Sequence, residues 1–146
     1  MSATASIDRA CELCRTDGGE ILWRNGLCRV VLVGDPDYPG FCRVILNRHV
    51  REMTDLDEDE RGRFMRIVFA AEAALRALLS PDKVNLASLG NQVPHLHWHV
   101  IPRFRDDRHY LAPIWAHPTR PSGVAPGVDR ARLSEFLASL LSPTRG

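Results

Sequence analysis

The sequence predicts an α+β domain in which a mainly antiparallel, five-stranded sheet packs against one long helix and a short C-terminal helix. Two β-type segments flank Asn25-Gly26, and this dipeptide is the strongest short hairpin signal. A single long segment carries apolar residues at helical spacing, and a later segment alternates histidine with apolar residues. Strands grouped around one long helix are typical of this fold class.

The 146 residues fit a single domain spanning 1–146. We expect residues 1–10 to be flexible and residues 104–146 to form a C-terminal extension of loops and one short helix. Apolar residues make up 45% and charged residues 25%, which is an ordinary globular composition. The net charge of +1 argues against a broad basic surface, so long nucleic acid is not expected as a partner.

The apolar segments are far shorter than the ~20 residues that a membrane-spanning helix needs. The N-terminal sequence has no apolar stretch like that of a secretory signal. We therefore expect a cytoplasmic protein without a membrane partner. In that reducing compartment the four cysteines should be thiols or metal ligands rather than disulfides.

The periodicity places the elements in order along the chain. The strands are expected at residues 20–23, 27–33, 41–47, 83–89 and 96–103. The long helix should begin at Thr54 and Asp55, which can cap it, and should end before Pro81. Its apolar stripe consists of Phe64, Ile67, Val68, Ala71, Leu75, Leu78 and Leu79. A proline- and glycine-rich loop over 117–127 and a short helix over 129–141 complete the chain.

Three of the six histidines alternate with apolar residues in the segment HLHWHV. Successive side chains of a strand point to opposite faces, so His95, His97 and His99 are expected on one face. The residues between them should pack on the long helix: Leu96, Trp98 and Val100. Three imidazoles on one face are costly unless each is hydrogen-bonded, liganded or partly hydrated, so this face is a candidate functional site.

Three interpretations fit this histidine face. The histidines can be incidental on a half-exposed strand. They can bind zinc, although no Asp or Glu lies between Lys83 and Phe104 to complete a hydrolytic site. Alternatively, one imidazole attacks a phosphate as a covalent nucleophile. The middle residue, His97, has the best-defined geometry for that role, and a neutral imidazole with a pKa of about 6.5 is a competent nucleophile.

The segment HLHWHVIP resembles the His-x-His-x-His motif of the histidine triad (HIT) superfamily of nucleotide hydrolases and transferases, particularly bacterial hydrolases of the diadenosine tetraphosphate hydrolase type. Asn85 lies ten residues before the triad, close to where the family carries an amide. Residues 38–41, YPGF, and the strand leading to His49 resemble the family's Pro-Gly-His strand and its following Pro-x-x-His. The resemblance covers roughly residues 11–103.

Two positions depart from the family pattern. Gln92 stands where members often carry a hydroxyl residue for the leaving group, and Phe41 stands in place of the strand histidine. We interpret Phe41 as a core residue. An amide at Gln92 can also donate a hydrogen bond.

The resemblance implies that His97 attacks an α-phosphate and forms a nucleotidyl-histidine, which water then resolves. His99 would orient His97 or hydrogen-bond the phosphate, and His95 would support the site. The turn at 90–93 could offer backbone N–H groups to phosphate oxygens. The expected substrate-binding residues are therefore Asn85, Asn91, Gln92 and Val93. The resemblance also implies a homodimer.

Cys11-x-x-Cys14 has the spacing of half a zinc site. A redox pair or two free thiols would have the same pattern, although no strand precedes this pair as in a thioredoxin-like unit. The resemblance implies a structural zinc ion bound by Cys11, Cys14, His49 and His95, with no cofactor required for the chemistry. Cys28 and Cys42 are expected to be small core residues.

Outside these motifs the sequence offers less. His109 and His117 have no partner by spacing and are expected as surface or loop residues. Trp115 could cover a site edge or an interface. The favoured interpretation is a HIT-type enzyme that cleaves a phosphoanhydride or phosphoramidate bond at a nucleoside α-phosphate, with dinucleoside polyphosphates or adenosine phosphoramidates as substrates. A non-catalytic nucleotide- or zinc-binding protein is the alternative.

Overall fold

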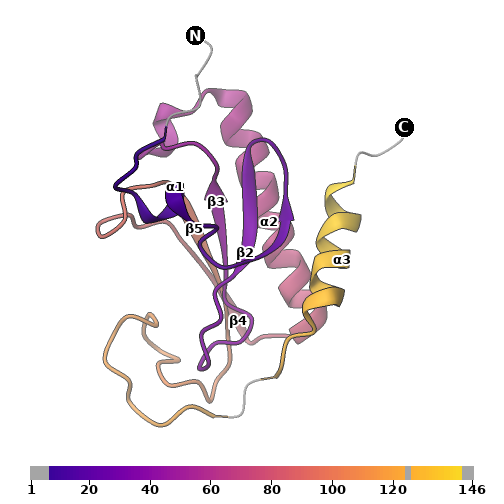
Figure 1. Cartoon of the computed structure of the whole chain (residues 1–146). Helices are drawn as coiled ribbons and strands as arrows, with labels where there is room; N and C mark the ends of the chain where they lie inside the picture. The colour runs from indigo at the N-terminus through magenta and orange to yellow at the C-terminus, as the bar shows by residue number, and fades with distance from the viewer. Residues whose placement is uncertain (1–6, 124–125, 143–146) are drawn as a thin grey trace.

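The computed structural model describes residues 7–123 and 126–142 of the chain (Figure 1). The five predicted strands are present, with slightly different ends. They are β1 (Glu20–Arg24), β2 (Cys28–Leu32), β3 (Cys42–Leu46), β4 (Lys83–Ala87) and β5 (His97–Arg103). They form one sheet in the order β1-β2-β3-β5-β4, in which every neighbouring pair is antiparallel. The predicted α+β fold with a five-stranded antiparallel sheet is confirmed.

The β1–β2 connection is the predicted hairpin around Asn25. The backbone N–H of Asn25 donates to the carbonyl of Cys28 at 3.0 Å. Its side-chain Oδ1 accepts from the N–H groups of Leu27 and Cys28, both at 2.9 Å. The local chemistry of one asparagine therefore closes the turn and sets the register of the first two strands.

The long helix α2 spans Glu58–Leu79 and starts later than predicted. The prediction that Thr54 and Asp55 cap it was wrong, because both lie in a separate 3-10 turn, η1 (Met53–Asp55). The cap is Asp57, whose side chain accepts from the backbone N–H of Glu60 while the Glu60 side chain bonds back to the N–H of Asp57. This reciprocal capping box gives hydrogen-bond partners to two backbone N–H groups at the start of the helix, which explains why the helix begins after Asp57 and not at Thr54 or Asp55.

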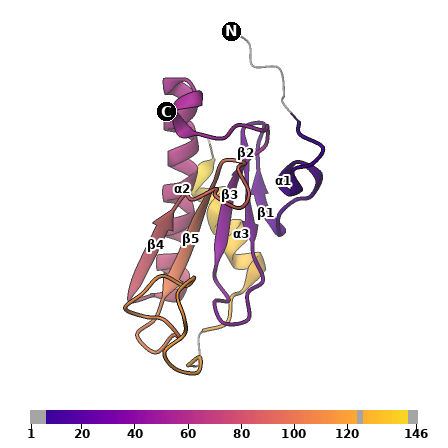
Figure 2. The same ribbon diagram turned by 90° about the vertical axis from the view of Figure 1, so that its left-hand side faces the viewer.

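The sheet has a different layer on each face (Figure 2). Helix α2 covers one face, and α3 (Arg130–Leu141) packs beside it against α2 and β1. Leu96 and Val100 are buried in the core under α2, with Trp98 packed against it, which confirms the predicted apolar face of the histidine segment. The short helix α1 (Glu12–Arg15) lies against the opposite face, the one to which the histidines belong.

The segment after β5 is tied down by buried polar contacts. Arg103 at the end of β5 forms a two-bond ion pair with Asp107, at 2.8 and 3.0 Å. His109, expected as a surface or loop residue, lies in a turn but is buried, and its Nδ1 lies 2.6 Å from the Tyr38 hydroxyl. No spacing rule links Tyr38 to His109, because the contact joins residues 71 positions apart.

The remaining part of the chain carries little regular structure. Residues 117–123 and 126–127 lie in no helix or strand, and His117 is exposed as expected. Residues 1–10 were predicted to be flexible, and the first six of them lie outside the described residues. Within the described ranges, no helix is long and apolar enough to cross a membrane.

Candidate functional site

The three triad histidines divide into two places. His97 and His99 lie in β5, whereas His95 lies two residues before the strand begins. The His95 side chain turns towards the N-terminal segment, and the other two face a pocket. A strict alternation in sequence therefore serves two different neighbouring sites.

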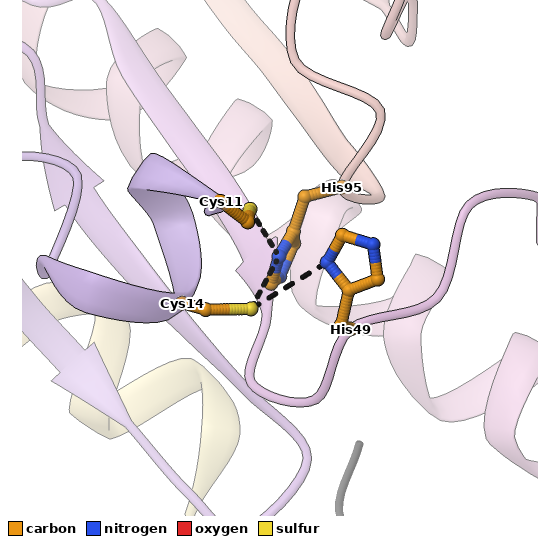
Figure 3. Close-up of side chains that lie close together, drawn as sticks. All are labelled: Cys11, Cys14, His49 and His95. Atoms are coloured by element: carbon orange, nitrogen blue, oxygen red, sulfur yellow. Dashed lines mark hydrogen bonds between the residues drawn. The ribbon is translucent and has the colours of Figure 1, made fainter. Parts of the chain in front are cut away.

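His95 belongs to a cluster with Cys11, Cys14 and His49 (Figure 3). One donor atom from each of the four residues lies within 4.8 Å of the others. The Nδ1 atom of His95 is 3.3 Å from the Cys11 sulfur and 3.5 Å from the Cys14 sulfur. The Cys14 sulfur is also 3.5 Å from Nδ1 of His49. Ligands on one tetrahedral zinc ion are separated by roughly 3.5 Å, so this spacing suits such an ion.

The other ring nitrogens of this cluster support metal binding. The Nε2 of His95 lies 2.6 Å from the carbonyl oxygen of Leu46, which can only accept a hydrogen bond. The proton is therefore on Nε2, and Nδ1 presents a lone pair to the sulfurs. The Nε2 of His49 lies 3.9 Å from the carboxylate of Asp8. Two sulfurs and two imidazoles, one of them oriented by the Leu46 carbonyl, are a chemically suitable donor set for zinc.

A pocket of about 460 Å³ lies beside this cluster. It is formed by the start of β5, the turn that precedes it, part of α1, β3 and the loop after β5. Its lining residues are Glu12, Leu13, Arg43, Leu89, Gly90, Asn91, Gln92, Val93, His97, His99 and Trp115. The structure thus brings His97 and His99 together with three of the four predicted substrate-binding residues.

The orientation of His97 is set by the backbone. Its Nδ1 lies 2.6 Å from the carbonyl oxygen of His95. Because a carbonyl only accepts, Nδ1 carries the proton and Nε2 carries the lone pair. Within the described residues Nε2 has no hydrogen-bond partner, and the ring lines the pocket. This is the tautomer that a nucleophilic imidazole requires.

His99 packs edge-to-face against His97, with ring centroids 4.9 Å apart. Its Nδ1 is buried and has no hydrogen-bond partner in the described part of the chain. Burial, the His97 ring and the Arg43 cation together lower the pKa of His99 to about 4. Burial also lowers the pKa of His97, and Arg43 adds to this, against the opposing effect of the bond to the His95 carbonyl. Both rings are therefore neutral at pH 7.

The turn before the strand is held by a glycine. Gly90 has a φ of +88°, which only glycine adopts without strain. The backbone N–H groups of Asn91, Gln92 and Val93 make no hydrogen bond to any described residue. Successive unpaired N–H groups form a concave site for anions, so this turn can bind phosphate oxygens.

Asn85 is not part of the same pocket. It lies in β4 and lines a neighbouring cavity of about 730 Å³. Its Oδ1 accepts a hydrogen bond from Arg103 at 2.7 Å. Trp115 and Leu89 line both cavities and separate the amide from the histidines.

Residues 17–106 match the model of the HIT domain. The chain belongs to the HIT family. That match covers the sheet, α2 and the histidine segment, and begins after the Cys11–Cys14 pair.

Two relatives, the AP-4-A phosphorylases of two strains of Mycobacterium tuberculosis, are each 28% identical over 102 residues. The match covers 66% of this chain and 52% of theirs, so the chain spans about half the length of the curated relatives it matches.

Solved HIT structures share the architecture over nearly the whole chain. A histidine triad protein from Bradyrhizobium japonicum is 25% identical with a TM-score of 0.67, and covers 94% of this chain and 96% of its own. A histidine triad protein from Marinobacter aquaeolei VT8 is also 25% identical with a TM-score of 0.68, and covers 92% of this chain and 99% of its own. The similarity extends beyond the HIT match into both ends of the chain.

Two further residues line the pocket that holds His97: Arg43, to which the sequence assigned no role, and Trp115, which was suggested to cover a site edge or an interface. Arg43 interrupts the apolar β3 segment, and a cation in a strand otherwise buried was the available signal. Trp115 packs edge-to-face on His99 with ring centroids 4.9 Å apart while remaining 51% exposed, so it covers the edge of the pocket. Phe41 is buried with Tyr38 and Ile101, as its interpretation as a core residue requires.

Proposed function

We propose that this HIT protein is a nucleotide hydrolase or transferase that cleaves a phosphoanhydride or phosphoramidate bond through a nucleotidyl-His97 intermediate. One observation carries the proposal. The Nδ1 proton of His97 is bound by the carbonyl of His95 at 2.6 Å, and the Nε2 lone pair is directed to a pocket. A positioned, neutral imidazole is already in its reactive form at pH 7.

The chemistry then runs in two displacements. The Nε2 lone pair of His97 forms a bond to the α-phosphorus as the bond to the leaving group breaks and that group departs with the electron pair. The phosphorylated ring is an imidazolium, and its Nδ1–H bond to the His95 carbonyl stabilises the new positive charge. Water or another acceptor then attacks the phosphorus, and the nitrogen–phosphorus electron pair returns to His97.

Preorganised hydrogen-bond donors would stabilise the negative charge that develops on the phosphate oxygens. The unpaired N–H groups of Asn91, Gln92 and Val93 lie along the same pocket as His97. Such donors are worth more in a water-poor site than in bulk water. The Trp115 ring over His99 reduces the access of water at this edge.

The predicted zinc ion would have a structural role in this scheme. Cys11, Cys14, His49 and His95 would bind it and thereby join the N-terminal segment to the loops after β3 and before β5. Bound zinc would also fix the backbone of His95, whose carbonyl orients His97. No step of the reaction involves the metal.

Two substrate classes fit the pocket chemistry. The 28% identity to the AP-4-A phosphorylases supports a dinucleoside polyphosphate, whose leaving group departs as an anion without needing a proton. A nucleoside phosphoramidate uses the same nucleophile but must release an amine. A binding protein without turnover is the rival function, and it is favoured by Gln92, which lines the pocket where the HIT pattern often has a hydroxyl residue.

The deciding experiment incubates the purified protein with diadenosine tetraphosphate and with an adenosine 5′-phosphoramidate and follows nucleotide release. Mass spectrometry of the quenched reaction should detect an adenylyl group on the peptide containing His97. Release of nucleotide together with this adduct supports the proposal. Nucleotide binding without release or adduct would establish the non-catalytic alternative.

The homodimer implied by the HIT resemblance is part of the same proposal. Strand β4 lies at an edge of the sheet, and no strand of residues 7–123 or 126–142 pairs with its outer side. Exposed apolar side chains lie near it, including Leu89 and Leu111. An unpaired edge beside exposed apolar groups favours pairing with a second copy. Sedimentation analysis should show twice the monomer mass of 16.4 kDa. A cytoplasmic location is likewise proposed, since all four cysteines are free.

A further inference from the structure

Two buried arginines, Arg29 and Arg103, and one half-buried arginine, Arg43, lie on neighbouring strands, and they differ in how many hydrogen bonds their guanidinium groups make. Arg29 in β2 makes four hydrogen bonds with all three of its nitrogens, to the carbonyls of residues 13, 16 and 17 and to Asn47. Arg103 in β5 is neutralised by Asp107 and also donates to Asn85. The hydrogen bonds of both guanidinium groups are therefore used within the fold.

Arg43 in β3 is different. Its one hydrogen bond within the described residues runs from Nη1 to the carbonyl of Gly18 and is long, at 3.4 Å. Its Nε is buried and has no hydrogen-bond partner in the part of the chain that the structure describes. No carboxylate of the described chain lies within ion-pair distance of it, although Glu12 lines the same pocket. A guanidinium cannot lose its proton, so Arg43 is a partly desolvated cation with unused donors.

Arg43 lines the pocket that contains His97, the proposed nucleophile. Arg43 is the direct cross-strand partner of His99, and both residues line the pocket with His97. The guanidinium carbon lies 5.8 Å from the centre of the Phe41 ring, a distance that fits a cation–π contact. The ring supports the cation from one side. Nη2 makes no hydrogen bond to any described residue and Nη1 makes only the long one, so the outer edge of the guanidinium can donate to a ligand.

We propose that Arg43 binds a second anionic phosphate group of the substrate, distinct from the phosphate attacked by His97. This inference rests on the proposed function and narrows its substrate class to nucleotides with at least two phosphate groups. Arginine suits the role because its planar donors match phosphate oxygens in pairs.

The register of the strands separates Arg43 from the reacting phosphate. His97 pairs with Ile45, whereas Arg43 pairs with His99, two residues further along the strands. Two residues of a strand span about 6.8 Å. At that distance from His97, Arg43 would contact the next charged group of the substrate and not the phosphate that His97 attacks. The reacting phosphate already has the N–H groups of the 90–93 turn.

The second phosphate has two chemical sources. It can follow the reacting phosphate in a polyphosphate chain, or it can be attached to the sugar of the nucleotide. Three adenosine ligands separate these sources: the 5′-monophosphate, the α,β-methylene diphosphate, whose carbon bridge resists cleavage, and the 3′,5′-bisphosphate. Their dissociation constants are measured by calorimetry on the full chain.

We expect one of the two bisphosphorylated ligands to bind the wild type about tenfold or more tighter than the monophosphate, as charge-assisted hydrogen bonds predict. In Arg43→Met this gain should disappear, while the affinity for the monophosphate changes by less than about threefold. Arg43→Lys should keep part of the gain. Arg66→Met is the matched control, because it removes the same charge from an exposed position on α2.

The outcomes separate this inference from the proposed function. If the wild type binds the monophosphate but gains nothing from a second phosphate, Arg43 has no such role and the nucleotide site stands. If folded Arg43→Met still binds the bisphosphorylated ligand more tightly than the monophosphate, Arg43 likewise has no such role. If none of the three ligands binds the wild type, the nucleotide site itself is wrong and this proposal is overturned with it.

Discussion

His95 and His97 are two residues apart, and each ring is held by a backbone carbonyl at 2.6 Å, yet the carbonyls bind opposite nitrogens. The Leu46 carbonyl takes the Nε2 proton of His95, which leaves Nδ1 facing the two cysteines. The carbonyl of His95 takes the Nδ1 proton of His97, which leaves Nε2 facing the pocket. The tautomer, and not the residue type, decides which ring can bind a metal and which can attack a phosphate.

The two regions also differ in what surrounds the free nitrogen. Around His95 the neighbours are sulfur atoms, and burial lowers the pKa of its imidazole. Around His97 the neighbours are another neutral ring, a cation and a turn with free N–H groups. The first environment suits a bound cation and the second suits a bound anion, so the two sites are electrostatically opposite although only Leu96 separates the two histidines in the chain.

The sharpest way to separate the two regions is to remove His97. His97→Ala should lower turnover by at least about 10³-fold, as for other covalent nucleophiles. Zinc content and melting temperature should stay close to those of the wild type, because the His95 side chain is untouched. His117→Ala, at an exposed loop position, is the control. Wild-type turnover in His97→Ala would contradict the proposed mechanism.

The opposite pattern is expected for Cys14→Ser. Purified wild type should contain close to one zinc ion per chain, and the variant much less. Loss of a ligand present at about a thousand times its dissociation constant removes about 4 kcal/mol of stability, which corresponds to a fall of about 10 °C in melting temperature. Metal analysis and calorimetry measure both quantities.

Cys42→Ala is the matched control for the metal site. Cys42 is fully buried, and burial raises the pKa of its thiol to about 12. Its replacement should lower the melting temperature through lost packing without changing the zinc content. A metal-free wild type whose stability is unaffected by chelator would rule out the zinc site and leave His95 as a support for His97 alone.

The pocket that contains His97 and His99 can be tested by measuring how the stability of the protein depends on pH. The pKa of His99 falls to about 4 in the folded chain, against about 6.5 when unfolded, so between these values the unfolded chain binds more protons. Stability from this residue is complete above pH 6.5 and is lost, by about 3 kcal/mol, as the pH falls to 4. His99→Gln should flatten that part of the profile in chelator-treated protein. The free energy of unfolding would be measured by denaturant titration at each pH. If its dependence on pH is the same in His99→Gln as in the wild type, His99 is not the group responsible.

The smallest expected effect concerns nucleotide binding. Adenosine monophosphate should protect the protein thermally, by about 2.7 kcal/mol at a hundred times its dissociation constant. Adenosine should protect far less, because it lacks the phosphate that the 90–93 turn and the histidine face would bind. His99→Ala should weaken the protection more than Asn85→Ala, since Asn85 lines the neighbouring cavity. Equal protection by adenosine and its monophosphate would contradict binding through the phosphate.

The sequence predicted those features that depend on local spacing. The Asn25 hairpin, the apolar stripe of α2 and the two faces of the histidine segment all follow from periods of two or 3.6 residues. The grouping of Cys11, Cys14, His49 and His95 joins residues up to 84 positions apart and came from the family resemblance rather than from spacing.

Features that depend on register between distant segments were not predictable in the same way. The pairing of Arg43 with His99 depends on how β3 meets β5, and no local pattern encodes it. The burial of His109 depends on its contact with Tyr38 across the fold. The division of the triad between two sites depends on where β5 begins, and the end of a strand is set by its partner's hydrogen bonds.

The ion pair between Arg103 and Asp107 has a consequence for the minimal folding unit of this protein. The HIT match ends at residue 106, and a fragment cut there would keep the nucleophile and the anion-binding turn. It would lose Asp107, the only carboxylate paired with Arg103 in the described chain, and it would also lose the His109 ring that contacts Tyr38. A buried guanidinium left without its counter-ion costs about 3–5 kcal/mol, a large part of the stability of an ordinary domain. The autonomous unit therefore extends past the HIT match. Because Leu133 and Leu137 of α3 are buried in the main core, a shortened version should keep the chain through Leu141.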